Sequence, residues 1–122
     1  MTLEECYTAI GGDYADVIGR LRSERLVQKF VLKFLDDKSY DLLRSSLETQ
    51  DYQEAFRAAH TMKGVCGNLA FNTLLESSEA LTEALRDGKP PQSGEEALIQ
   101  RVTEDYQRTV QAIQAFQEGV SG

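Results

Sequence analysis

One histidine and one lysine, three positions apart, are the residues of this chain best placed for chemistry. His60 is the only histidine among the 122 residues, and Lys63 follows it in a segment whose apolar residues recur at helical spacing. At that spacing the imidazole and the ammonium lie about one turn apart on the same face. The opposite face is an apolar row made of Tyr52, Ala55, Ala59, Met62, Cys66 and Leu69, with Phe56 at its edge. We therefore expect an exposed nucleophilic ring beside a positive charge.

Two glycines follow His60 on the polar face of the helix, and each lowers the stability of the helix. A glycine inside a helix costs about 1 kcal/mol relative to alanine, so Gly64 and Gly67 need a reason. Close packing against another helix is one reason. Clearance is another, because a missing side chain one turn after His60 lets a second macromolecule approach the ring. Gln53 and Arg57 precede His60 on the same face.

The motif His60-Thr61-Met62-Lys63-Gly64, preceded by two alanines and followed by Gly67-Asn68-Leu69, resembles the His-x-x-Lys-Gly signature of histidine-containing phosphotransfer (HPt) domains of bacterial two-component phosphorelays. In that family the histidine accepts a phosphoryl group from the aspartate of a receiver domain and passes it to another. The resemblance extends roughly from Leu26 to the end of the chain. Many members carry glycine where this chain has Ala70, a difference that affects the turn after the helix and not the phosphoryl chemistry.

The resemblance and the chemistry of the side chains together suggest roles for His60, Lys63 and Arg57. His60 would be the phosphoacceptor, and a neutral imidazole, with an ordinary pKa of about 6.5, is nucleophilic at neutral pH without an activating base. Lys63 would steady the phosphoryl oxygens as a point charge. Arg57 could do the same or pair with an acid of the partner. The expected receiver-docking face consists of Gln53, Arg57, Gly64 and Gly67.

The sequence contains no machinery for using ATP. It has no Walker loop, no glycine-rich nucleotide fingerprint and no aspartate cluster at a strand end that would hold Mg²⁺. We therefore expect a phosphocarrier and not an enzyme, with no cofactor and no metal of its own. The resemblance implies that the receiver domain brings the Mg²⁺. A single histidine also argues against a di-iron or haem bundle.

Two further functions fit a helical chain with this motif. One is a helical adaptor that binds its partner without phosphorylation. The other is the phosphoacceptor domain of a chemotaxis-type kinase, which would need a dimerisation and ATP-binding region downstream. His60, Lys63 and Gly64 together favour phosphotransfer, because an adaptor has no reason to keep all three.

Composition predicts one globular domain spanning residues 1–122. The chain has 20 acidic and 13 basic residues, a net charge of −7, and no basic cluster, which argues against nucleic-acid binding. It lacks an apolar run of about 18 residues and a signal peptide, so we expect a cytoplasmic protein that does not enter the membrane. Cys6 and Cys66 lack metal-ligand spacing and are expected to be reduced thiols, not a disulfide. We expect a monomer whose partners are receiver domains of response regulators or hybrid histidine kinases.

Apolar residues recur at steps of three and four along the whole chain, which predicts an all-α fold. Short connections favour an up-down-up-down four-helix bundle over about residues 39–118, with short N-terminal helices covering one end. The predicted helix caps are Thr2 with Glu5, Asp13, Ser23, Asp51 with Glu54, and Ser93 with Glu96; the predicted stops are Gly11-Gly12, Gly88 with Pro90-Pro91, and Gly119. The predicted core contains Phe30, Phe34, Leu43, Phe56, Ala59, Cys66, Leu74, Leu81, Val102, Tyr106 and Ile113.

Overall fold

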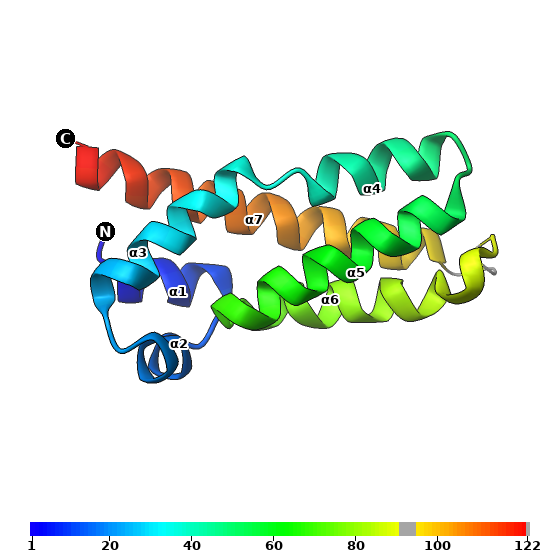
Figure 1. Cartoon of the computed structure of the whole chain (residues 1–122). Helices are drawn as coiled ribbons and strands as arrows, with labels where there is room; N and C mark the ends of the chain where they lie inside the picture. The colour runs from blue at the N-terminus through cyan, green and yellow to red at the C-terminus, as the bar shows by residue number, and fades with distance from the viewer. Residues whose placement is uncertain (91–94, 122) are drawn as a thin grey trace.

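The computed structural model describes residues 1–90 and 95–121, which are mostly helical and contain no strand. In chain order the elements are α1 (Leu3–Ile10), α2 (Tyr14–Leu21), α3 (Glu24–Lys33), the 3₁₀ turn η1 (Phe34–Asp36), α4 (Ser39–Glu48), α5 (Tyr52–Leu69), α6 (Asn72–Ala84), the 3₁₀ turn η2 (Arg86–Gly88) and α7 (Glu95–Ser121). Figure 1 shows α4 to α7 alternating in direction, with α1, α2 and α3 gathered at one end. The predicted all-α bundle with additional N-terminal helices is confirmed.

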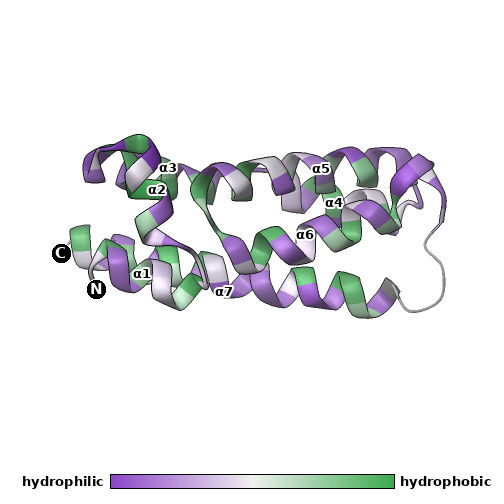
Figure 2. Ribbon diagram, turned by 90° about the horizontal axis from the view of Figure 1, so that it is seen from below, coloured by the Kyte–Doolittle hydropathy of each residue, from purple (hydrophilic) through white to green (hydrophobic). Residues whose placement is uncertain are grey.

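The four long segments form a bundle because each buries one apolar face. α4 packs on α5, α5 on α6, and α6 on α7. Tyr40 of α4 links the first helix of the bundle to the last: its ring stacks on Tyr106 of α7 with centroids 3.9 Å apart, and its hydroxyl hydrogen-bonds the Thr103 hydroxyl at 3.1 Å. Figure 2 shows hydrophobic and hydrophilic residues alternating along each helix, as expected for helices with one buried face.

Most of the predicted core residues are buried, namely Phe34, Leu43, Ala59, Cys66, Leu74, Leu81, Val102 and Ile113. Phe56 and Tyr106 are partly buried and pack against this core. The prediction for Phe30 is wrong, because its side chain is 38% exposed. α3 lies at the end of the bundle and buries only the row of Val27 and Val31, so the rest of its broad apolar stripe faces outward.

The helix that carries the histidine begins with half of the predicted capping box. The Asp51 side chain accepts a hydrogen bond from the Glu54 N–H at 3.2 Å. The Asp51 N–H donates instead to the Ser46 carbonyl of α4, so the Glu54 carboxylate does not return the bond. The other predicted N-caps in the described residues form at Thr2 with Glu5, Asp13 and Ser23. The predicted cap at Ser93 lies outside the described residues.

Of the predicted stops, Gly11 ends α1, whereas α6 already ends at Ala84 and Gly88 closes the 3₁₀ turn η2. Gly11 and Gly88 adopt left-handed backbone conformations, with φ of 78° and 67°. α7 runs to Ser121 and does not end at Gly119, because a lone glycine near a helix end does not by itself stop the helix.

α5 ends in a left-handed turn that an alanine occupies. Ala70 has a φ of 56°, a conformation that costs an L-residue about 1–2 kcal/mol. Its side chain is buried and its carbonyl accepts a hydrogen bond from the Asp13 N–H at 2.9 Å. Packing and this bond hold the turn, so alanine at this position preserves the shape that glycine would adopt more easily.

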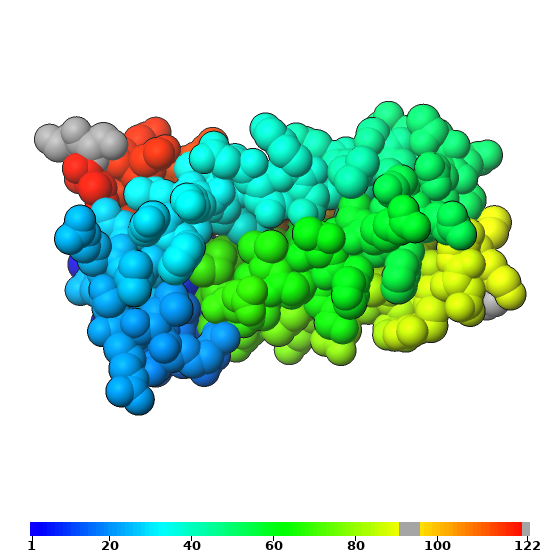
Figure 3. Space-filling model, in the orientation of Figure 1, coloured from blue at the N-terminus to red at the C-terminus, as the bar shows by residue number. Residues whose placement is uncertain are grey.

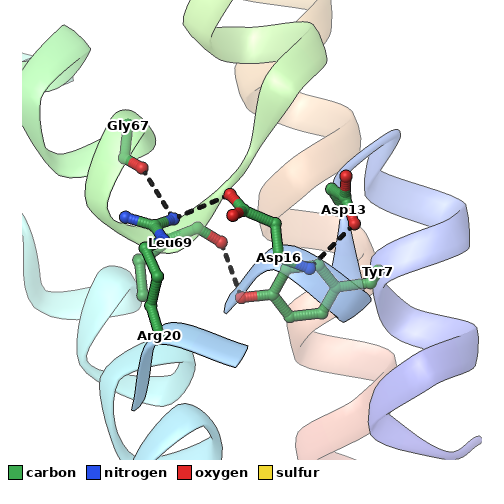
Figure 4. A network of polar contacts seen from close by, with 6 residues as sticks. All are labelled: Tyr7, Asp13, Asp16, Arg20, Gly67 and Leu69. Carbon is green, nitrogen blue, oxygen red and sulfur yellow. Dashed lines mark hydrogen bonds and ion pairs between the residues drawn. The ribbon is translucent and has the colours of Figure 1, made fainter. Parts of the chain in front are cut away.

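The N-terminal helices hold the C-terminal end of α5, as Figure 4 shows. The Tyr7 hydroxyl of α1 donates to the Leu69 carbonyl at 2.8 Å. Arg20 of α2 donates to the Gly67 carbonyl at 3.1 Å and pairs with Asp16 at the same distance. The last carbonyls of a helix have no partner within the helix. These contacts therefore satisfy and fix the end of α5.

Candidate functional site

His60 lies in the middle of α5 with its side chain exposed. The imidazole stacks on the Phe56 ring one turn earlier, with ring centroids 6.0 Å apart and an angle of 14° between the planes. Phe56 in turn packs against the core. One side of the imidazole is thus supported by the bundle while the rest faces solvent. Sequence reasoning missed this contact, although an aromatic residue four positions before a histidine on a helix is a signal for it.

Lys63 lies one turn after His60 and is half-buried. Its side chain makes no ion pair within 4 Å in the part of the chain that the structure describes. The pKa of Glu83 on α6 is lowered, mainly by the hydrogen bond from Arg86 and to a smaller extent by the positive charge of Lys63. The ammonium therefore acts on Glu83 only over a distance and forms no ion pair with a carboxylate of the described residues.

The two glycines leave space on this face. A Cβ added at Gly64 would meet nothing within 4 Å, and one added at Gly67 would meet only the Leu75 Cδ1 at 3.9 Å, an ordinary contact. Internal packing therefore does not explain Gly64. The clearance explanation for Gly64 stays a prediction.

Gln53 and Arg57 lie on the N-terminal side of His60, and both are exposed. Arg57 Nη1 is 3.6 Å from Glu54 Oε1, and the arginine side chain is 71% exposed. A hollow of about 440 Å³ opens beside them against η2; its lining residues are Gln53, Phe56, Arg57, Arg86, Asp87 and Gly88.

A second hollow lies beyond the C-terminal half of the same helix. It has a volume of about 440 Å³ and is lined by Arg20, Leu21, Phe30, Lys33, Phe34, Asp37, Val65, Asn68 and Leu69. Figure 3 shows this side of the molecule, with α5 crossing its middle between the N-terminal helices and the turn at η2. The exposed ring of Phe30, assigned to the core by its spacing, borders this second hollow.

The comparisons with known proteins identify the family. The Hpt domain family model matches residues 26–116, which include α4, α5 and α6 and the His60 motif, so the chain belongs to the Hpt domain family. Hpt domains are phosphotransfer modules of two-component relays that interact with receiver domains. Among curated proteins and among solved structures, no match was found.

Two observations concern metals and membranes. Within residues 1–90 and 95–121, no three His, Cys, Asp or Glu side chains are grouped so that they could hold a metal ion. None of the helices in these ranges is both long enough and apolar enough to span a bilayer.

Proposed function

We propose that this chain accepts a phosphoryl group on His60 from the aspartate of a receiver domain and passes it to another receiver. The observation that carries the proposal is the exposed imidazole on α5, with Lys63 one turn away and open space above Gly64. Membership of the Hpt family supplies the chemical class.

The proposed step exchanges one bond to phosphorus for another. A ring nitrogen of neutral His60 uses its lone pair to form a P–N bond, and the P–O bond to the receiver's aspartate breaks. The carboxylate leaves with the electron pair, so no base has to remove a proton for the attack. Negative charge spreads over the three equatorial oxygens in the transition state. Lys63 would stabilise that charge from this chain, and Mg²⁺ bound by the receiver would do so from the other side.

The proposed docking face surrounds His60 and consists of Gln53, Arg57, Gly64 and Gly67. Gln53, Arg57 and Gly64 are exposed and Gly67 is partly exposed, on a helix bonded to neighbouring helices at both ends, which supports rigid-body docking without rearrangement. We expect a small, transient interface, because a relay must release its partner after each step. The second hollow, with the exposed Phe30 ring, would add an apolar edge to this contact. The partners would be receiver domains of response regulators or hybrid kinases.

A two-receiver relay tests the proposal. One receiver is loaded with acetyl phosphate, separated from the donor and mixed with the chain, and a second, unphosphorylated receiver is then added. We expect acid-labile, base-stable phosphate on the chain, followed by its loss to the second receiver. Lys63→Ala should slow the first step while leaving the helical circular dichroism unchanged. An adaptor would bind the receiver and remain unphosphorylated, which would contradict the proposal.

A further inference from the structure

We infer that the hollow beside His60 binds an acidic side chain of the partner receiver, and that Arg57 makes this contact. The inference rests on the proposed function, because the ligand is part of the receiver. The proposed function describes the phosphoryl step, and this inference adds a chemical reason why one partner is preferred over another.

The position of the hollow connects it to the phosphoacceptor. It lies between the first half of α5 and η2, and the Phe56 ring that lines it also stacks on His60. A domain that brings an aspartyl phosphate to the imidazole therefore covers the mouth of the hollow as well. A side chain on the part of that domain's active-site rim that faces the hollow would then be within reach of Arg57.

Arg57 has hydrogen-bonding capacity to spare. Its contact with Glu54 spans 3.6 Å, beyond the range of a hydrogen bond. A guanidinium offers five N–H donors in a planar fork that matches a carboxylate. Glu54 thus keeps Arg57 close to the hollow without using its donors, and the arginine can bind a second carboxylate through two hydrogen bonds.

The other charges around the hollow favour a single carboxylate on the Arg57 side. Arg86 is already engaged, since its Nε and Nη2 both donate to the Glu83 carboxylate. Asp87 adds a negative charge at the η2 side. An anion is therefore repelled by Asp87 and by Glu54, and it is attracted by the N–H donors of Arg57 that Glu54 leaves unused.

Receivers offer the matching chemistry. The acid that Arg57 would bind lies at the rim of the receiver's active site and is separate from the carboxylates that hold Mg²⁺, which stay engaged with the metal. An arginine fork outside the reacting atoms would steer and orient such a surface, and rim charges of this kind act mainly on the association rate.

The test compares Arg57→Glu with a matched control, Arg101→Glu. Arg101 is also an exposed arginine with one long ion pair, at 3.7 Å to Glu76, but it lies on α7. The second-order rate of phosphoryl transfer is measured from a receiver that phosphorylates the unmodified chain, at low and high ionic strength. Labelling of His60 by phosphoramidate, which needs no receiver, is measured in parallel.

We expect Arg57→Glu to slow transfer from the receiver by about tenfold or more at low salt, and by less at high salt. The transfer rate of Arg57→Lys should lie between those of Arg57→Glu and the unmodified chain, because lysine keeps the charge but cannot form two parallel hydrogen bonds to a carboxylate. Arg101→Glu should transfer at the original rate. Acidic residues at the rim of the receiver's active site, other than the Mg²⁺ ligands and the phosphorylated aspartate, are exchanged one at a time for arginine. One such exchange should restore transfer to Arg57→Glu, which would identify the contact.

Two results would overturn the inference while the proposed function stands. One is equal transfer to Arg57→Glu and Arg101→Glu. The other is a fall in phosphoramidate labelling as large as the fall in receiver transfer, which would place Arg57 in the chemistry and not in recognition. A different result would refute the proposed function, and this inference with it: phosphoramidate labels the chain, but none of the receivers tested phosphorylates it.

Discussion

At the scale of single residues, His60 combines exposure with support from one side. Its imidazole is open to solvent, and the Phe56 ring under it connects it to the packed interior. A supported ring samples fewer orientations than one free to rotate, so less entropy is lost when donor and acceptor align. Under the proposed function, Phe56 would be a positioning residue for His60.

The Phe56 stack can be tested by exchanging the ring for an aliphatic group. Phe56→Leu keeps most of the apolar packing and should change stability by less than about 1.5 kcal/mol. We expect slower labelling of His60 by phosphoramidate, and recovery in Phe56→Tyr, which restores an aromatic ring. The labelling rate and the melting temperature are measured on the same samples. Equal labelling of the leucine and tyrosine variants would show that the stack has no role in positioning.

At the scale of the helix, a substitution at Gly64 distinguishes two explanations for this glycine, clearance for a partner and packing inside the bundle. Gly64→Gln should raise stability by up to about 1 kcal/mol through helix propensity, because a Cβ added there meets nothing within 4 Å. The same side chain should block transfer from a receiver by obstructing its approach to His60.

Gly19 of α2 provides the matched control for this substitution. It is another exposed helical glycine where an added Cβ would meet nothing within 4 Å. Gly19→Gln should gain stability in the same way and transfer normally. A Gly64→Gln chain that transfers at the original rate would refute the clearance explanation.

The turn that ends α5 gives a second prediction at this scale. Ala70 and Arg22 both cap helices with a left-handed backbone, at φ of 56° and 57°. Glycine relieves that strain, so Arg22→Gly, at an exposed position, should stabilise the fold by about 1 kcal/mol. Ala70→Gly should gain less, because it also removes a buried methyl group. Urea unfolding measures both, and a larger gain at Ala70 would contradict this reasoning.

The sequence was sufficient for the local features of these helices. Caps such as Asp13 and Ser23 depend on residues three positions apart, and apolar rows depend on one helix at a time, so both could be predicted. Phe30 could not, because its exposure depends on how little of α3 the bundle covers. The half-formed box at Asp51 escaped prediction for a similar reason, since its N–H bonds to Ser46 of the preceding helix.

At the scale of the whole molecule, α1 and α2 complete the structure around α5. Residues 1–25 lie outside the matched family region, yet Tyr7 and Arg20 bond the last carbonyls of the histidine helix. These long-range bonds have no signature in the sequence. They make the N-terminal segment part of what holds the site rigid.

Burial of the two thiols gives the molecule a specific response to alkaline pH. Burial raises the pKa of the Cys6 thiol to about 11 and of the Cys66 thiol to about 12. In the unfolded chain the pKa of a cysteine thiol is about 8.5. Stability from these groups is therefore fully present below about pH 8.5 and is lost as the pH rises towards the folded pKa values.

We expect the free energy of unfolding in urea to fall steadily between about pH 9 and 11. Cys66→Ala should show a smaller slope over the same range, although its stability at pH 7 is lower. In native conditions at pH 8, a thiol reagent should react with both cysteines far more slowly than in urea. A constant unfolding free energy from pH 8 to pH 10 would contradict the burial of these thiols.

The central claim is that His60 is the phosphoacceptor, and one measurement tests it most directly. A receiver carrying radiolabelled phosphate is mixed with the unmodified chain and with His60→Gln, and melting temperatures confirm that both are folded. The account predicts acid-labile label on the unmodified chain, none on His60→Gln, and nearly equal melting temperatures, because an exposed side chain contributes little to packing. Label on the His60→Gln chain, or its absence from both chains with every receiver tested, would contradict the claim.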